Sequence, residues 1–385
     1  MKDEEIRVAL GTAIVLGLSK GRADCAPTTA HMLIGTSCGH SCGYCNVQNS
    51  QIARISWPSF NKKKVLESDF SGFGRICLQV AGDGLDNAVQ LIHELKRFGL
   101  PISAAAHIVE VDDVDKLIAA GADTVCIPLD AATPEIAELS GRCSFHALLG
   151  TITEASKKHP RKIATHLIIG LGETEKDAVE MIARMDNIGV RTALFAFTPV
   201  KGSRFGDREP AHIGAFRRVQ IAKYLVEHRG AGRGKTAFHY DGKNRLIDLP
   251  EVSAEAFLTS GCPGCNRPYF DSPGSAFYSY PRRLSVEEAA RAFRQSRAYE
   301  WTNLHKAGKL MRVKLEHIDG IITRLRITGD FFIHPEEGIS VIEKAYEGCG
   351  IDRASIENTA DMAVKGVEIF GFDSKSLAEA ILGAI

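Results

Sequence analysis

The chain has little that would attract a polyelectrolyte or cross a membrane. Among its 385 residues, Lys+Arg and Asp+Glu each number 47, so the formal net charge at pH 7 is zero. No overall field therefore attracts nucleic acid or anionic lipid. The apolar stretch from Val8 to Leu18 is too short for a spanning helix, and acidic residues rather than a basic signal-peptide region precede it. We expect a cytoplasmic protein with neither nucleic acid nor membrane among its partners.

The ten cysteines do not form the pattern of a small disulfide-rich scaffold. In a chain of this length, local groups of cysteine favour metal binding over disulfides. Three of them, Cys38, Cys42 and Cys45, follow a short apolar strand, His31 to Ile34, with spacings of three and two residues. Three thiolates from one loop suit a [4Fe–4S] cluster whose fourth iron stays open to a small molecule. A zinc site completed by a distant His or Cys is the alternative, as are thiols with no shared role.

Short apolar strands alternate with amphipathic helices through the first 200 residues. We predict strands at 75–80, 101–108, 124–129, 163–170 and 192–197, with helices after Asp86, Val114, Pro134 and Thr174. This alternation predicts an α/β fold with a parallel sheet covered by helices. Either a (β/α) barrel, complete or partial, or an open doubly wound sheet fits the pattern, and chemistry is expected at the carboxyl ends of the strands.

The cysteine loop, with Tyr44 before its last cysteine, resembles that of the radical S-adenosylmethionine (SAM) superfamily. The runs Gly11–Ala13, Gly17–Gly21 and Pro27–Ala30 are similar to the start of the biotin-synthase-like group, which includes two-component lipoyl synthases. The resemblance implies a (β/α)6-type partial TIM barrel over residues 1–300. It also implies that Cys38, Cys42 and Cys45 hold a [4Fe–4S] cluster that chelates SAM and cleaves it to a 5′-deoxyadenosyl radical.

The same resemblance suggests residues that contact SAM. Ala81-Gly82-Asp83 lies where the family usually has Gly-Gly-Glu, so this chain departs from the pattern. The full expected set is Tyr44, Gly82, Asp83, His107, Glu110, Gly170 and Glu173. For the glycines, the alternative is that they supply only backbone freedom at turns.

A second cysteine motif, Cys262-Pro-Gly-Cys265, predicts two thiols that point the same way. Zinc and a redox disulfide are alternatives; outside the first loop, no second pair of this spacing exists to complete a zinc ribbon. Resemblance to lipoyl synthases implies an auxiliary [4Fe–4S] cluster on Cys25, Cys262 and Cys265 that gives up sulfur. We expect Cys77 and Cys126 to be buried small apolar residues, and Cys143 and Cys349 to be structural.

The last part of the chain, from residue 281, differs in its sequence pattern from the α/β region before it. We assign residues 281–307 to a basic helix and linker, and residues 308–385 to a small α+β domain. Its start alternates Met311, Val313 and Leu315 with charged residues, and Asp319-Gly320 turns the chain into Ile321, Thr323, Leu325 and Ile327. This pattern predicts a hairpin with one buried face. The run from Arg326 to Glu337 resembles the accessory domain of lipoate–protein ligases, which assists lipoyl or octanoyl transfer and helps to engage the carrier.

Together, the resemblances imply a lipoyl-synthase-type sulfurtransferase that inserts sulfur at carbon six or eight of a protein-bound octanoyl chain. The expected partners are an octanoylated lipoyl carrier protein, a paralogous second radical SAM synthase, and an electron donor such as ferredoxin or flavodoxin. Biotin-type or other radical SAM chemistry is the first alternative. A non-catalytic metal-binding subunit of a lipoate ligase is the second. A basic patch at Arg229, Arg233 and Lys235 either contacts an acidic carrier or is a solvated loop.

Overall fold

A computed structural model describes residues 5–22, 24–35, 38–45, 51–52, 55–141, 144–228, 237–270, 277–307 and 309–385. Cys143 and the basic patch at Arg229, Arg233 and Lys235 lie outside these described residues. The chain divides into two compact units, which are treated separately below. The first comprises residues 1–211 and 216–289, and the second comprises residues 212–215 and 290–385.

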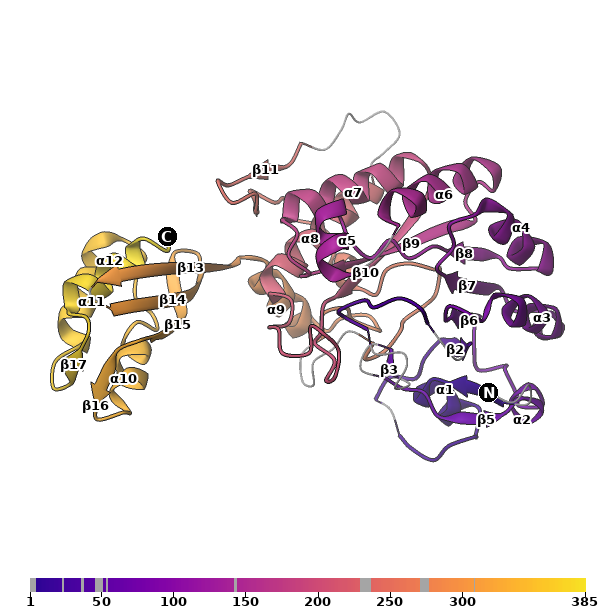
Figure 1. The fold of residues 1–385 in the computed structure, drawn as a ribbon, viewed down its shortest axis with the longest axis horizontal. Helices are drawn as coiled ribbons and strands as arrows, with labels where there is room; N and C mark the ends of the chain where they lie inside the picture. The colour runs from indigo at the N-terminus through magenta and orange to yellow at the C-terminus, as the bar shows by residue number, and fades with distance from the viewer. Residues whose placement is uncertain are drawn as a thin grey trace. The chain divides into compact units, whose positions relative to one another are not determined.

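An eight-stranded sheet forms the centre of the first unit, in the order β10-β9-β8-β7-β6-β2-β1-β5 (Figure 1). Six neighbouring strands are parallel: β2 Thr29–Ile34, β6 Arg75–Val80, β7 Ile102–Ala106, β8 Thr124–Cys126, β9 Ile163–Ile169 and β10 Arg191–Ala196. Two antiparallel strands, β1 Glu5–Val8 and β5 Ser59–Asn61, extend the β2 edge. Six parallel strands in chain order, each joined to the next through helical segments, confirm the predicted partial barrel.

Helices cover the outer face of the parallel strands, and Figure 1 shows α3, α4, α6 and α7 following one another along it. Their bounds are α3 Leu85–Leu95, α4 Val111–Ala120, α5 Pro134–Ser140, α6 Phe145–Lys158, α7 Glu175–Asn187 and α8 Ile213–Glu227. Thr174 and Asp177 form the predicted capping box at the start of α7, and Val179, Ile182 and Met185 bury its apolar face. Shorter elements of this unit are α1 Leu10–Val15, α2 Lys62–Leu66, β3 Gln51–Ile52, β4 Ile55–Ser56, β11 His239–Tyr240 and β12 Leu246–Ile247.

A buried ion pair joins α7 to α8. The guanidinium of Arg218 donates to both carboxylate oxygens of Glu175, with its shortest contact at 2.6 Å. The side chains are only 2% and 7% exposed. Glu175 also accepts from the backbone N–H of Leu246 at 2.9 Å, so the same carboxylate fixes the 237–247 segment. Such a fully hydrogen-bonded pair offsets the cost of burying two charges.

We expect Glu175→Ala to destabilise the first unit by about 3–5 kcal/mol, because it leaves the Arg218 guanidinium buried without its counter-charge. Urea unfolding followed by circular dichroism measures this loss. Glu180→Ala is the matched control on the same helix: Glu180 lies 4.0 Å from Lys176 in an exposed pair, which contributes only about 0–1 kcal/mol. Equal stability of the two variants would contradict a structural role for the buried pair.

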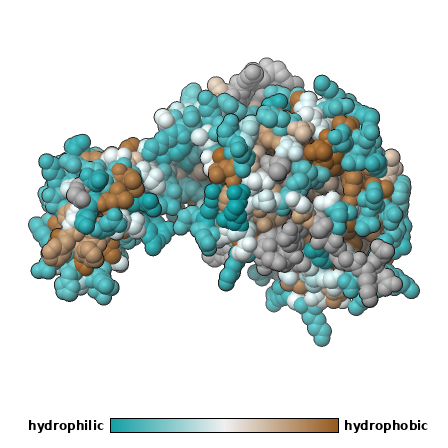
Figure 2. Space-filling model, viewed as in Figure 1, coloured by the Kyte–Doolittle hydropathy of each residue, from teal (hydrophilic) through white to brown (hydrophobic). Residues whose placement is uncertain are grey.

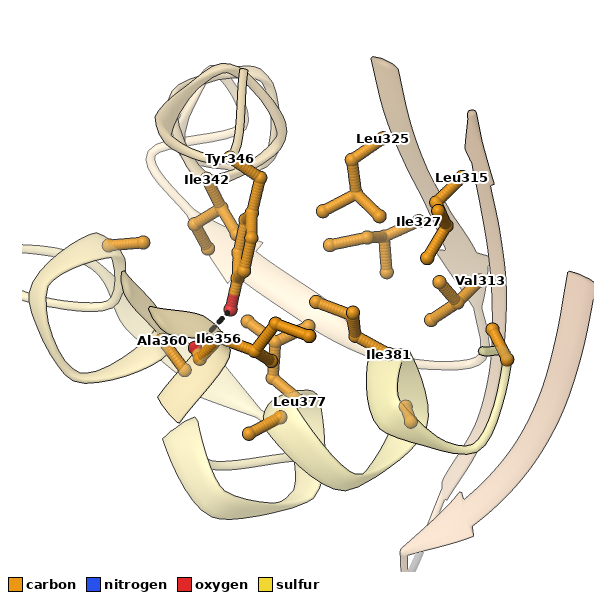
Figure 3. Packing of buried hydrophobic residues seen from close by; sticks show 14 of the residues in the cluster. Val313, Leu315, Leu325, Ile327, Ile342, Tyr346, Ile356, Ala360, Leu377 and Ile381 are labelled. Carbon is orange, nitrogen blue, oxygen red and sulfur yellow. Dashed lines mark hydrogen bonds between the residues drawn. The ribbon is translucent and has the colours of Figure 1, made fainter. Parts of the chain in front are cut away.

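The second unit is a three-stranded antiparallel sheet with helices packed on one face. The strands are β13 Ala298–Ala307, β14 Lys309–Ile318 and β15 Ile321–Gly329, and the helices are α10 Gly338–Ala345, α11 Arg353–Ala363 and α12 Ser374–Leu382. Figure 3 shows Val313, Leu315, Leu325 and Ile327 from the sheet facing Tyr346 and Ile381 from the helical side. The Tyr346 hydroxyl, inside this core, donates to the backbone oxygen of Ile356 at 3.4 Å. A small ribbon of β16 Phe332–His334 and β17 Glu368–Phe370 completes the unit.

Two details of the tail differ from the sequence analysis. Residues 298–307, expected to be part of a linker, form β13 after the helix α9 Val286–Ser296, so the second unit begins before residue 308. The β14–β15 hairpin is confirmed, but a bulge at Glu316/His317 shifts the alternation along β15. As a result Ile322 is fully buried, whereas Ile321, placed on the buried face by simple alternation, is 46% exposed.

No helix among the described residues is long and apolar enough to cross a membrane. In Figure 2 the face in view is largely hydrophilic over the helices of the first unit, and its apolar residues lie in separate patches. The apolar side chains of the helices are instead turned towards the sheet, as the amphipathic pattern predicts.

Candidate functional site

A cavity of about 260 Å³ lies inside the partial barrel, and we call it the barrel cavity. Its wall is made by side chains that point inward from β2, β6, β7, β8, β9 and β10. The cysteines Cys38, Cys42 and Cys45 line it from the loop after β2, and Cys262 and Cys265 line it from the segment after β12. The structure therefore brings both predicted cysteine motifs to one cavity.

The first cysteine loop is held by its neighbours through backbone hydrogen bonds. Gly43 donates to Ser140 at 2.7 Å and accepts from Phe205 at 2.8 Å. Tyr44, next to Gly43, donates its hydroxyl proton to the Asp130 carboxylate at 2.7 Å, which ties the loop to the segment that follows β8. These bonds hold the backbone between Cys42 and Cys45.

The absence of a side chain at Gly43 lets the Phe205 ring lie against the loop. A Cβ at this position would come within 2.8 Å of ring atoms of Phe205. The ring is buried and cannot easily yield, because the Arg208 guanidinium stacks 3.5 Å from its centroid.

We expect Gly43→Ala to weaken iron binding by the first loop roughly 5- to 150-fold, since overpacking costs about 1–3 kcal/mol. Iron and sulfide per chain after anaerobic reconstitution measure this effect. Gly39→Ala is the matched control in the same loop, because a Cβ there meets no atom within 4 Å. Normal iron retention by the Gly43 variant would show that the Phe205 contact does not shape the loop.

The second cysteine pair lies deeper, beside the amino-terminal half of the strands. The Cys265 sulfur is 3.8 Å from Nε2 of His31, a buried residue of β2. Burial raises the pKa of the Cys262 thiol, while the positive charge of Arg75 at the start of β6 opposes that rise. Burial, aided by the charge of Arg267, lowers the pKa of His31 to about 3, so its imidazole is neutral at pH 7.

Cys77 and Cys126 also line the barrel cavity, which the sequence analysis does not anticipate. Cys126 is buried and packs with Ala105 and Ala164 in a small apolar cluster, as expected, and Cys77 is partly buried; both residues also lie near the second cysteine pair. Burial and the nearby charges of Cys262 and Cys265 raise the pKa of Cys77 to about 12. In strand register, Cys77 lies between His31 and Ser103. The missing information was which side chains of β6 and β8 point into the barrel, and a single sequence does not reveal this.

Cys25 lies beside the second cysteine pair but not among the residues that line the barrel cavity. Asn266 makes the connection: its amide donates to the Cys25 sulfur at 3.6 Å and to the Ala26 oxygen at 2.9 Å. Its side-chain oxygen accepts from the Thr28 N–H at 2.9 Å. Asn266, missed by the sequence analysis, thus joins the two segments that carry the three thiols.

The expected SAM contacts divide into two groups. Tyr44, Gly82 and His107 line the barrel cavity, and the His107 ring lies 4.0 Å from that of His40, centroid to centroid. Asp83, Glu110, Gly170 and Glu173 do not line it. The Glu173 carboxylate instead accepts from three backbone N–H groups, those of Gly170, Leu171 and Gly172, at 2.6–3.1 Å. In this structure Glu173 therefore shapes the loop between β9 and α7.

Among the described residues, no three Cys, His, Asp or Glu side chains surround one point where a single metal ion would bind. In an iron–sulfur cluster each thiolate binds a different iron, so the sulfur atoms are spread more widely. Three thiols from one ordered loop, all facing one cavity, fit such a cluster.

Comparison with known proteins agrees with this chemistry. The family description "Radical SAM superfamily" matches residues 32–185, a range that begins in β2 and includes the first cysteine loop. These residues form a radical SAM domain. A radical SAM domain implies a [4Fe–4S] cluster and SAM as cofactors.

Curated relatives of the radical SAM domain include biotin synthases. That of Lysinibacillus sphaericus is 24% identical over 155 residues, 37% of this chain and 46% of the relative. That of Thermus thermophilus is 27% identical over 184 residues, 44% of this chain and 55% of the relative. The chain thus spans about half the length of the curated relatives it matches.

Two solved structures are also similar to parts of the chain. Methylornithine synthase is 15% identical, with a TM-score of 0.42, over 52% of this chain and 61% of that one. A structure from a study of a bi-partite lipoate protein ligase and its E2 lipoyl domain from Thermoplasma acidophilum is 27% identical, with a TM-score of 0.21, over 22% of this chain and 96% of that one.

Proposed function

We propose that the protein is a radical SAM enzyme that inserts sulfur at carbon six or eight of a protein-bound octanoyl chain. The observation that carries this proposal is the placement of the two cysteine motifs at different depths of the barrel cavity, with Cys25 beside the second motif. Cys38, Cys42 and Cys45 would hold the SAM-binding [4Fe–4S] cluster, and Cys25, Cys262 and Cys265 an auxiliary [4Fe–4S] cluster that supplies the sulfur.

The depth difference provides room for a substrate between the two groups. Cys265 lies beside His31, whereas the first cysteine loop follows Ile34 at the end of the same strand. Three residues of β2 span about 10 Å. A carbon atom held between the two groups is therefore within reach of a radical from one side and of a sulfur atom from the other.

The lining of the barrel cavity suits an unbranched apolar chain. The lining includes small residues, Ala105, Ala164 and Ala193, and aromatic ones, Phe195 and Phe197. Small side chains leave space along the axis, and the rings exclude water from it. Such a lining stabilises an alkyl chain by about 0.8 kcal/mol per buried CH₂.

The protein's own residues position and insulate the reaction. When bound, the first cluster and SAM supply a radical that can take hydrogen from an unactivated carbon, which side-chain acid–base groups cannot do. Tyr44 and Asp130 hold the loop of the first cluster, and His31, neutral at the cavity wall, places no charge beside the alkyl chain. The thiols of Cys77 and Cys126 stay protonated when no metal is bound, because burial raises both pKa values.

The second unit supports the choice of a protein-bound substrate. Its residues 326–337 carry the resemblance to the accessory domain of lipoate–protein ligases. Phe332 and Phe370, partners across β16 and β17, are 73% and 64% exposed. An exposed aromatic pair is typical of an interaction site. We propose that this pair helps to dock the octanoylated carrier, and that a paralogous synthase and a ferredoxin or flavodoxin act with the enzyme.

The test is anaerobic turnover of an octanoyl-lysine peptide with reconstituted protein, SAM and dithionite, with and without a paralogous synthase. Peptide mass spectrometry is expected to show a gain of one sulfur, and fragmentation to show whether carbon six or eight carries it. Formation of 5′-deoxyadenosine without sulfur in the peptide, even with the paralogue, would retain the radical chemistry and overturn the octanoyl substrate.

The biotin synthases among the relatives favour a second candidate, sulfur insertion into a free small molecule. Dethiobiotin in place of the octanoyl peptide tests it in the same assay. Sulfur transfer to dethiobiotin alone would select this candidate. If no 5′-deoxyadenosine forms with either substrate, the result would favour the alternative that the protein is a non-catalytic metal-binding subunit.

A further inference from the structure

A second cavity, of about 700 Å³, lies on the other side of the Cys262–Cys265 segment, and we call it the outer cavity. It is bounded by the end of α8, the start of β10, residues 255–266 and residues 280–283. Four residues, Ser260, Gly261, Cys262 and Cys265, line both cavities. The cysteine segment is therefore a partition with one face towards the substrate space and the other towards the outer cavity.

The lining of the outer cavity is more polar than that of the barrel cavity. Its charged lining residues are Arg191, Lys223, Arg282 and Arg283, with Asp186, Glu227 and Glu255 as the acids. Lys223 is buried and pairs with Glu227 at 2.5 Å, and Arg282 pairs with Glu288 at 2.7 Å. Outside these pairs the lining holds Arg191 and Arg283 together with Asp186 and Glu255, so it carries four basic and three acidic side chains. A lining with this many charged groups suits a small hydrated ion better than an alkyl chain.

Cys25 lies next to the outer cavity. Its thiol donates to the backbone oxygen of Pro281 at 3.9 Å, and Pro281 lines the outer cavity. Asn266, which contacts the Cys25 sulfur, also lines it. All three thiols of the auxiliary group thus lie at or beside the outer cavity, away from the mouth that the first cysteine loop occupies.

We propose that the outer cavity is the entry route by which hydrosulfide reaches Cys25, Cys262 and Cys265 and replaces the sulfur that the reaction removes. This inference rests on the proposed function, because sulfur insertion takes one sulfide from the auxiliary group for each carbon–sulfur bond. One HS⁻ restores it: iron–sulfur bonds form, the S–H bond breaks, and the proton leaves to solvent. This exchange itself transfers no electron; the electron that carbon–sulfur bond formation leaves on the iron passes to an oxidised one-electron carrier, such as the ferredoxin or flavodoxin proposed above.

The experiment measures access of an anion to the auxiliary thiols in the full chain without metal. Peptide mass spectrometry follows labelling of Cys262 and Cys265 by the anionic 2-sulfonatoethyl methanethiosulfonate and by neutral iodoacetamide. Arg283→Glu, and separately Arg191→Glu, are expected to lower the ratio of anionic to neutral labelling rates about tenfold at low salt. The loss is expected to shrink at 1 M salt, where charges are screened beyond about 3 Å.

Lys157→Glu on α6 is the matched control, because it makes the same change from a positive to a negative side chain and Lys157 lines neither cavity. An unchanged ratio in both arginine variants, or an equal fall in the control, would overturn the route. Because the labelling needs no cluster, its outcome is independent of the proposed reaction.

A second measurement separates the two proposals. Reconstituted wild-type protein is given ³⁴S-sulfide after one turnover and is then allowed a second. The second product is expected to carry ³⁴S. A different result is that the labelling rates depend on the arginine charges while the second product contains no ³⁴S. That combination would support the outer cavity as a route for anions and overturn its role in replacing sulfur.

Discussion

Cys42→Ala is expected to reduce 5′-deoxyadenosine formation from SAM to background. The three thiols of the first loop all face the barrel cavity, and the backbone bonds of Gly43 and the Tyr44–Asp130 bond fix their loop. With one thiol removed, one iron of the cluster loses its ligand and the cluster is not retained. Iron is expected to fall from about eight to about four atoms per chain, since only an auxiliary [4Fe–4S] cluster would remain.

Cys349→Ala, in the second unit, is the control for loss of a thiol outside the barrel. Its sulfur lies 3.2 Å from the Thr359 hydroxyl and 3.3 Å from the Gly350 oxygen, within its own unit. Deoxyadenosine formation and iron content are expected to match the wild type. A Cys42 variant that still cleaves SAM would show that another group holds the SAM-binding cluster.

Cys262→Ala is expected to retain SAM cleavage and to lose sulfur insertion. SAM cleavage continues, because the first loop is intact, but no carbon–sulfur bond forms. Iron again falls to about four atoms per chain, now from the auxiliary group. Deoxyadenosine and sulfur-containing peptide, measured in the same reaction by mass spectrometry, are the two readouts.

Cys77→Ala tests whether the effect belongs to the second cysteine motif or to any thiol in the cavity. Cys77 faces the same space as Cys262 but comes from β6. We expect it to retain both iron and sulfur insertion. Equal loss of cleavage and insertion in Cys262→Ala would contradict separate roles for the two cysteine groups, and loss of iron in Cys77→Ala would add Cys77 to the auxiliary ligands.

The fold was predictable where local chemistry decides it. The β6 strand matches its predicted range, and Thr174 with Asp177 caps α7 as expected. The strand predicted to end at Leu129 stops at Cys126, ahead of Pro128, which has no N–H to donate to a neighbouring strand. Helix α6 was missed because its cap, Ser144, adopts a left-handed backbone and makes no side-chain capping bond, so its start carries no local signal.

The site was predictable only in part, because its members are joined by tertiary contacts. The spacing of the first cysteine loop is local, and so is that of Cys262 and Cys265. The roles of Asn266 and Phe205 depend on the meeting of segments that lie more than a hundred residues apart in the chain. The parallel strands are apolar on both faces, so no alternation along β6 and β8 indicates that Cys77 and Cys126 also border the barrel cavity.

The edge position of β13 has a consequence for separating the two units. This strand pairs with β14 from Ala298↔Ile318 to Ala307↔Lys309, and Asn303 bonds the Ala380 oxygen of α12 at 2.9 Å. A tail fragment starting at residue 308 would expose the whole hydrogen-bonding edge of β14, with Met311, Val313 and Leu315 alternating along it. Such a bare edge is a template for aggregation. Any natural or engineered split of this polypeptide that yields a well-behaved tail must therefore cut upstream of Ala298.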